Sequence, residues 1–133
     1  MENAYDLAII GAGPGGYVAA IRASELGLKT VCIDKRAELG GTCLNVGCIP
    51  SKALLSSSVL LASFSHNKQE HGILTSEISY DFSHMMKRKT EIIKSLNQGI
   101  EASFKKFHVD HGQLMWGDFD MIFPIANLYE GKF

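Results

Sequence analysis

The stretch Leu7-Ala8-Ile9-Ile10-Gly11-Ala12-Gly13-Pro14-Gly15-Gly16 decides the fold class predicted for this chain. It is a short apolar run that ends in a G-x-G-x-x-G pattern, and residues 17–27 continue with apolar side chains at helical spacing. Gly27 suits the end of that helix, and residues 29–34 are rich in β-branched side chains. We therefore predict a strand, a tight turn, a helix and a second, parallel strand, which together begin a doubly wound α/β sheet.

The glycines of this turn suit a dinucleotide phosphate. Each glycine removes a side chain that would block the turn, the approach of a pyrophosphate or the packing of the helix. The free N–H groups and the dipole at the start of the helix favour an anion there. Asp34 ends the second strand, where a carboxylate can accept hydrogen bonds from an adenosine ribose. NAD and FAD use the same turn, and a plain tight turn with a solvated Asp34 is the structural alternative.

Four further segments follow this unit. An irregular segment is predicted at 35–46 and a helix at 50–65. A loop or short strand is predicted at 72–83, and a long amphipathic helix at 85–107. Beyond residue 107 the pattern gives only weak strand hints, at 113–116 and 121–125.

Composition narrows the function classes. The 133 residues are 46% hydrophobic and 20% charged, with a formal net charge of −1, which is typical of a globular domain. Because no basic cluster occurs, we predict binding neither to nucleic acid nor to a membrane. The amino terminus lacks a basic leader, so we expect a cytoplasmic protein, or a mitochondrial matrix protein if this is a mature organellar chain. The three cysteines do not complete a zinc site, and we predict no metal.

Two of these cysteines, Cys43 and Cys48, lie five positions apart just ahead of the predicted helix. Five residues of regular helix rise about 7.5 Å, beyond the usual Cα separation of a disulfide, so a bridge requires distorted backbone, for which Gly47 is suited. The helix start and Lys52 would stabilise a thiolate after reduction. Two inert buried thiols or a stray metal site are the alternatives, and Cys32, inside the second strand, is predicted to be core.

The segment Gly40-Gly41-Thr42-Cys43-Leu44-Asn45-Val46-Gly47-Cys48-Ile49-Pro50-Ser51-Lys52-Ala53-Leu54-Leu55, following the glycine turn, resembles the dihydrolipoamide dehydrogenases of the flavin disulfide reductase family. Glutathione and mercuric reductases share the cysteine spacing, but Leu44 and the residues 49–53 are more similar to the lipoamide enzymes. The resemblance covers roughly residues 5–107. It implies an incomplete, Rossmann-like FAD-binding domain, a parallel sheet with flanking helices, followed by a divergent tail at 108–133.

The resemblance also implies roles for individual residues. Gly11, Gly13 and Gly16 would contact the FAD pyrophosphate, Asp34 would contact the adenosine ribose, and Lys35 is a further cofactor-binding candidate. Gly41 and Thr42 would continue the diphosphate contacts. Cys43 would exchange with the substrate, Cys48 would contact the flavin, and Lys52 would place a cation at the flavin edge. Cys43 and Lys52 are therefore both catalytic and cofactor-binding candidates. Electrons would pass from dihydrolipoamide through the disulfide and FAD to NAD⁺.

Members of that family are several times longer, and the resemblance implies what the longer protein does. It would bind NAD⁺ in a further domain, form a homodimer, and act on the lipoyl domain of 2-oxo acid dehydrogenase complexes or of the glycine cleavage system. We expect this chain to be an amino-terminal part of such an enzyme, without turnover by itself. The alternatives are a truncated, inactive dinucleotide-binding module and a glutathione- or mercury-type reductase.

Overall fold

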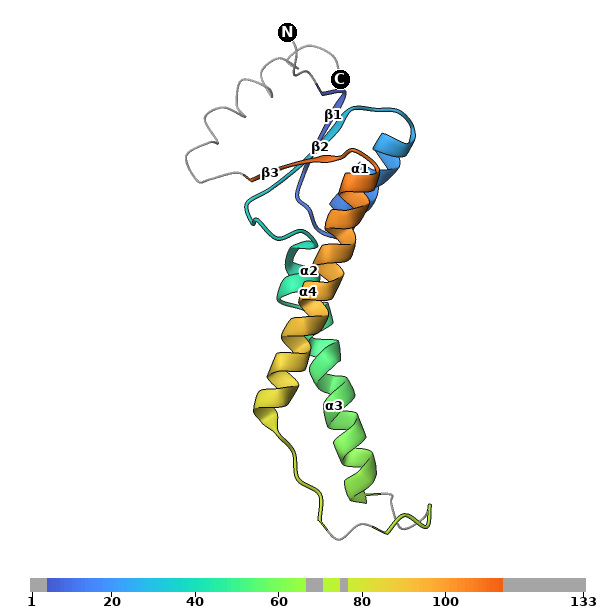
Figure 1. Cartoon of the computed structure of the whole chain (residues 1–133), viewed down its shortest axis with the longest axis vertical. Helices are drawn as coiled ribbons and strands as arrows, with labels where there is room; N and C mark the ends of the chain where they lie inside the picture. The colour runs from blue at the N-terminus through green and yellow to red at the C-terminus, as the bar shows by residue number, and fades with distance from the viewer. Residues whose placement is uncertain (1–4, 67–70, 75–76, 114–133) are drawn as a thin grey trace, which may run out of the picture. The chain divides into compact units, whose positions relative to one another are not determined.

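The structure of the chain is a computed structural model that describes residues 5–66, 71–74 and 77–113. In chain order (Figure 1) its elements are β1 Leu7–Ile10, α1 Pro14–Glu25, β2 Thr30–Asp34, α2 Gly41–Asn45, α3 Cys48–His66, α4 Phe82–Lys106 and β3 Asp110–Gln113. They belong to two compact units, which are Met1–Gly41 with Ile100–Phe133, and Thr42–Gly99. We call them the sheet unit and the thiol unit and describe each by itself.

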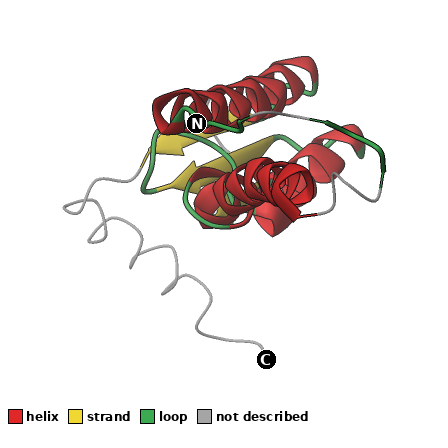
Figure 2. Ribbon diagram, turned by 90° about the horizontal axis from the view of Figure 1, so that it is seen from below, coloured by secondary structure: helices red, strands yellow, loops and turns green. Residues whose placement is uncertain are grey.

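The sheet unit is built on three parallel strands in the order β1-β2-β3 (Figure 2). Leu7 pairs with Thr30, and Val31 pairs with Asp110. Because β2 is central, its Thr30 and Cys32 are fully buried. Within the described residues β1 is paired on one side only, and its Ile10 is 69% exposed. The predicted α/β class with a parallel sheet and flanking helices is confirmed.

Helix α1 contacts both β1 and β2 and buries Ala20 and Ala23. It begins at Pro14, earlier than the predicted position 17, because proline is well suited to the first helical position. It ends at Glu25, since Gly27 has a φ of +89°, a left-handed conformation that closes a helix. The strand–turn–helix–strand order therefore follows the sequence pattern, with shifts only at the helix ends.

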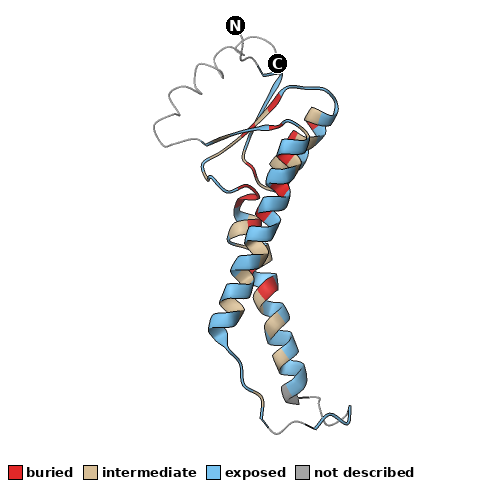
Figure 3. Cartoon of the chain, in the orientation of Figure 1, coloured by how far each residue is buried: buried red, intermediate tan, exposed pale blue. Residues whose placement is uncertain are grey.

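The thiol unit contains α3 and the first part of α4. Most of α3 is exposed (Figure 3), including apolar side chains such as Leu55, Val59 and Leu60. Two side chains of α4 donate hydrogen bonds to the preceding segment. Arg88 Nη1 donates to the Ala53 carbonyl at 3.1 Å, and Asn97 Nδ2 donates to Asn45 Oδ1 at 2.8 Å. These two polar contacts join α4 to α3 and to α2.

One helical stretch among the described residues, Gly41–Phe64, is long and apolar enough to cross a membrane by length and composition alone. Core helices of soluble proteins pass the same test, so this finding is weak evidence for a span. The predicted lack of membrane binding stays a prediction.

Other predicted bounds also differ from the structure; helix α4, for example, begins at Phe82 and not at position 85. Part of the segment predicted to be irregular forms α2, because Gly40 and Gly41, with φ of +93° and +62°, complete a reversal from which a helix starts at once. Helix α3 begins at Cys48, not at position 50. The third strand is Asp110–Gln113, earlier than the predicted 113–116. The described part of 72–83 contains no strand, and 121–125 lies outside the described residues.

Candidate functional site

The glycine turn lies between β1 and α1 in the sheet unit. Gly11 has a φ of +100°, and its N–H donates to the Ile33 carbonyl at 2.6 Å, which ties the end of β1 to β2. A Cβ at Gly16 would overlap the Gly11 carbonyl oxygen, so the helix can start this close to the strand only with glycine. Gly13 is the N-cap of α1 and, among the described residues, no side chain caps the helix start. The N–H groups in the first turn of α1 are therefore available to an anion.

A second loop meets this turn. The Gly40 N–H donates to the Ala12 carbonyl at 2.8 Å, and a Cβ at Gly41 would lie 2.6 Å from Gly13 Cα. Both Gly41 and Ala12 are buried. The structure thus brings the predicted Gly13 and Gly41 together as a bare backbone cradle, which fits a pyrophosphate better than it fits any bulky side chain. Thr42 follows directly and is exposed.

Asp34 ends β2 beside the glycine turn. Its Oδ2 accepts from the Ala12 N–H at 2.7 Å, and its Oδ1 accepts from the Arg36 N–H at 3.0 Å. Partial burial opposes ionisation, but the N–H groups of Arg36 and Ala12 and the charge of Arg36 together hold the pKa of Asp34 below its usual value. The carboxylate is therefore charged at neutral pH. Each of its oxygens still has a lone pair for a ribose hydroxyl.

Lys35, the neighbouring candidate, is exposed, and its carbonyl accepts from Gln113 Nε2 at 3.3 Å. Cys32 is fully buried in β2, and burial followed by the nearby charge of Asp34 raises the pKa of its thiol. A buried, protonated thiol is a poor nucleophile. Cys32 is thus unsuited to the exchange chemistry expected of the other two cysteines.

In the thiol unit, Cys43 lies on α2 and Cys48 in the first turn of α3. The Thr42 carbonyl accepts from both the Val46 N–H at 2.9 Å and the Gly47 N–H at 2.8 Å. The second bond joins residues five positions apart and so forms a single π-type turn. In such a turn, side chains five positions apart lie on the same side of the helix. Cys43 and Cys48 are free thiols joined by a hydrogen bond. The distorted backbone that a bridge requires is therefore present at Gly47.

Opposing influences act on the Cys43 thiol. The hydrogen bond with the Cys48 side chain is the largest and raises its pKa; partial burial and the Cys48 charge act in the same direction. The Cys48 N–H and the positive charge of Lys52 lower the pKa but do not prevail. The expected stabilisation of a thiolate by the helix start and Lys52 is present at Cys43. It is outweighed because the hydrogen bond with Cys48 favours the protonated form of the Cys43 thiol.

We expect substitutions at Cys48 and Lys52 to move the reactivity of Cys43 in opposite directions. Cys48→Ala removes the hydrogen bond that raises the pKa of Cys43, so alkylation by iodoacetamide near pH 7.5 should be roughly two- to five-fold faster. Lys52→Gln removes a charge that lowers this pKa and should slow the reaction. The difference should vanish at pH values above the raised pKa, where all chains carry the thiolate. Peptide mapping by mass spectrometry measures the rate, and equal rates in both variants would contradict this assignment.

The predicted site residues thus form two groups. The sheet unit brings Gly11, Gly13, Gly16, Asp34 and Gly41 around one turn, and the thiol unit brings together Cys43, Cys48 and Lys52. The first group can hold a dinucleotide through backbone N–H groups and one carboxylate. The second can cycle between a dithiol and a disulfide. Among the described residues, no cluster of three His, Cys, Asp or Glu side chains could hold a metal ion.

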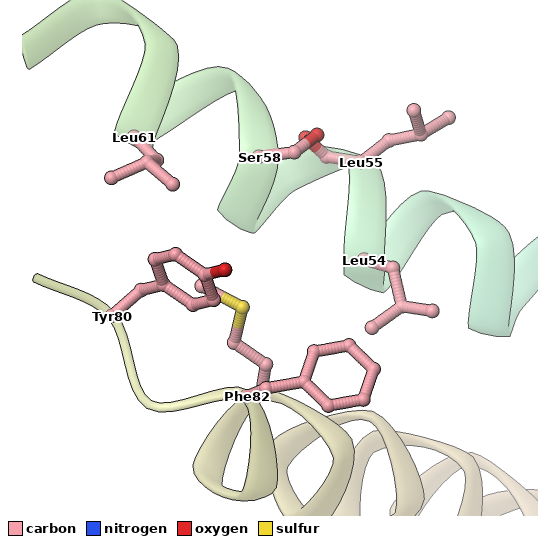
Figure 4. A pocket seen from close by; sticks show the side chains of 7 residues that line it. Leu54, Leu55, Ser58, Leu61, Tyr80 and Phe82 are labelled. Atoms are coloured by element: carbon pink, nitrogen blue, oxygen red, sulfur yellow. The ribbon is translucent and has the colours of Figure 1, made fainter. Parts of the chain in front are cut away.

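Two features were missed from sequence. One is the Asn45–Asn97 pair beside the thiols. Asn97 stands four positions after Ile93 and three before Ile100, so a polar residue on an apolar helical face was the available signal. The other is a hollow of about 320 Å³ where Leu54 and Leu61 of α3 point toward Tyr80 and Phe82 (Figure 4). Its lining is apolar except for two hydroxyl groups, Ser58 and Tyr80, so it offers packing surface and no redox chemistry.

The chain is similar in sequence to known proteins. The profile of the pyridine nucleotide-disulphide oxidoreductase family matches residues 5–117. A mitochondrial dihydrolipoyl dehydrogenase of Schizosaccharomyces pombe is 56% identical over 109 residues, which are 82% of this chain and 21% of that protein. A leghemoglobin reductase of Vigna unguiculata is 56% identical over 106 residues, 80% and 20% of the two chains. A dihydrolipoyl dehydrogenase of Cupriavidus necator is 47% identical over 114 residues, 80% and 24% of the two chains.

Proposed function

Because the chain belongs to the pyridine nucleotide-disulphide oxidoreductase family, we propose that it is the amino-terminal part of an FAD-dependent dihydrolipoyl dehydrogenase. The proposed reaction is oxidation of protein-bound dihydrolipoamide with NAD⁺ as the final acceptor. The names of the relatives in Schizosaccharomyces pombe and Cupriavidus necator support this choice. The chain spans about a fifth of the length of the curated relatives it matches. The activity is therefore proposed for the longer protein.

One observation carries the proposal. Cys43 and Cys48 are in hydrogen-bond contact across a π-type turn at the start of a helix, although their spacing in a regular helix would keep them apart. A geometry that costs a distorted backbone is expected where the two sulfurs must meet. Two inert thiols would not require it. A pair that closes and opens as a disulfide does.

The residues of this chain have distinct roles in the proposed reaction. The N–H groups at the start of α1, with the Gly13–Gly41 cradle, hold the pyrophosphate, and Asp34 accepts hydrogen bonds from the adenosine ribose. The bound FAD supplies the capacity to take two electrons from a dithiol and release them to NAD⁺. Dihydrolipoamide reduces the Cys43–Cys48 disulfide. Its own two thiols lose two electrons and two protons and become a disulfide, while Cys43 and Cys48 become thiols.

Within this exchange Cys43 is proposed to form the mixed disulfide with substrate, and Cys48 to be the thiol next to the flavin. Lys52, one helical turn after Cys48, supplies a positive charge that favours thiolate at Cys43. For the longer protein we propose a homodimer that acts on the lipoyl domain of a 2-oxo acid dehydrogenase complex or of the glycine cleavage system. The cytoplasm, or the mitochondrial matrix by analogy with the relative in Schizosaccharomyces pombe, is its proposed location.

The test is a fusion enzyme in which residues 5–113 of this chain replace the matching part of the Schizosaccharomyces pombe relative. We expect a flavin absorbance band and reduction of NAD⁺ that depends on dihydrolipoamide. Activity only with glutathione disulfide or with mercuric ion would favour the related reductases instead. A fusion that folds without flavin would overturn the proposal. The 133-residue chain assayed alone should show no turnover, and turnover by it would remove the alternative of an inactive module.

A further inference from the structure

Asn45 lies between the two thiols in the sequence and is bound by a residue 52 positions away. Its Oδ1 accepts a hydrogen bond from Asn97 Nδ2 at 2.8 Å, and the same Nδ2 group lies 3.3 Å from the Ile93 carbonyl. Asn97 is 7% exposed. Both asparagines belong to the thiol unit, so this contact is internal to it.

Asn97 is costly at its position. Within the described part of the chain its Oδ1 is buried and has no hydrogen-bond partner. A buried polar atom without a partner destabilises a protein, and leucine would be the better residue for the apolar face of α4 on both packing and helix propensity. This cost is offset by the hydrogen bond that Asn97 Nδ2 donates to Asn45 Oδ1.

Holding Asn45 restricts the turn that brings the sulfurs together. Asn45 is the last residue of α2, and the π-type turn at Val46 and Gly47 follows it directly. Without an anchor the reduced chain would sample regular helical conformations here, in which the sulfurs separate. Closing the disulfide would then have to remove that freedom. Anchoring Asn45 removes it beforehand and so favours the disulfide.

We propose that Asn97, acting through Asn45, is a positioning residue that holds Cys43 and Cys48 in the arrangement from which their disulfide forms. This rests on the proposed function, since it assumes that the pair is a redox couple. The reaction that measures it uses glutathione disulfide as the oxidant. Cys43 and Cys48 lose two electrons and two protons to form one S–S bond, and one glutathione disulfide becomes two glutathione thiols.

The experiment is the redox equilibrium of the 133-residue chain in glutathione buffers, in a Cys32→Ala background so that only this pair is counted. Samples are acid-quenched and labelled with maleimide, and mass spectrometry gives the fraction oxidised. Asn97→Leu should lower the equilibrium constant for the disulfide about five-fold, the effect of one hydrogen bond. Arg88→Met is the matched control, because it removes the other polar contact of α4, which goes to the Ala53 carbonyl of α3 and not to the α2 segment that holds Asn45, and should leave the constant unchanged. In concentrated guanidinium chloride all chains should give one common value.

A second variant separates positioning from loss of structure. If Asn97 acts through Asn45, then Asn97→Leu introduced into an Asn45→Ala chain should change the constant by less than about two-fold. Equal constants for the parent chain and Asn97→Leu, both above the denatured value, would overturn the positioning role and leave the proposed function intact. A parent chain that already gives the denatured value would overturn both. An effect of Arg88→Met as large as that of Asn97→Leu would overturn the positioning role, because the cause would then be a general loosening of α4.

Discussion

A Gly16→Ala chain is expected to lose the cooperative unfolding of its sheet unit, whereas a Gly15→Ala chain is expected to keep it. A Cβ at Gly16 would overlap the Gly11 carbonyl oxygen and lie 2.9 Å from the Gly11 carbonyl carbon. Both are backbone atoms of the turn that joins β1 to α1, so no side-chain rotation can relieve the clash. We expect the free energy of unfolding to fall by about 3 kcal/mol or more.

Gly15 makes a close control because it is the preceding residue of the same helix. Among the described residues nothing lies within 4 Å of a Cβ built there, so alanine has room and should add up to about 1 kcal/mol through its helix propensity. Urea unfolding followed by circular dichroism measures both changes. Quenching of flavin fluorescence measures FAD affinity, which should fall only for Gly16→Ala. Two variants of equal stability would show that the turn tolerates a side chain and would contradict the close approach of helix and strand.

The glycine turn was predictable because its determinants are local. They follow one another closely in the sequence: the apolar run, the glycines, Pro14 and the second strand. Each of them favours the same order of strand, turn, helix and strand. The carboxylate of Asp34 was also predictable as the end of a strand. Its hydrogen bond from the Ala12 N–H was not, because that contact arises only once the two strands pair.

The thiol segment was predictable in outcome but not in form. The spacing of Cys43 and Cys48 required a distorted backbone, and Gly47 marked its position. The sequence did not show that α2 precedes the distortion, because glycines such as Gly41 predict irregular structure even where they only start a helix. No sequence pattern predicts that the Thr42 carbonyl accepts hydrogen bonds from both Val46 and Gly47.

Long-range contacts account for what the sequence could not predict. The third strand reads Asp-His-Gly-Gln, a sequence of poor strand propensity, and forms because β2 offers an unpaired edge. The Tyr5 hydroxyl, donating to Asp110 at 2.7 Å, adds support from the other end of the chain. The same limit applies to Asn97, whose partner is far away in sequence.

Replacing either thiol in the fusion enzyme is expected to reduce dihydrolipoamide oxidation about a thousand-fold or more, while the flavin stays bound. Serine at Cys43 or at Cys48 is nearly the same size but cannot form a disulfide, so electrons from the substrate have no covalent route into the protein. Flavin should be retained because the backbone cradle and Asp34, which we propose to bind it, belong to the sheet unit. Activity of Cys43→Ser near that of the parent would contradict the proposed role of the pair.

Cys32 supplies the matched control for that experiment. It carries the same thiol, but it is fully buried in β2 and its pKa is raised by burial. Cys32→Ala should therefore keep the activity within about two-fold, at a stability cost of about 1 kcal/mol for the small cavity left behind. Stopped-flow spectra extend the comparison: with dihydrolipoamide, the Cys32→Ala enzyme should still show rapid flavin reduction, and neither serine variant should. A loss of activity for Cys32→Ala as large as for Cys43→Ser would mean that thiol chemistry in this chain is not confined to the π-type turn.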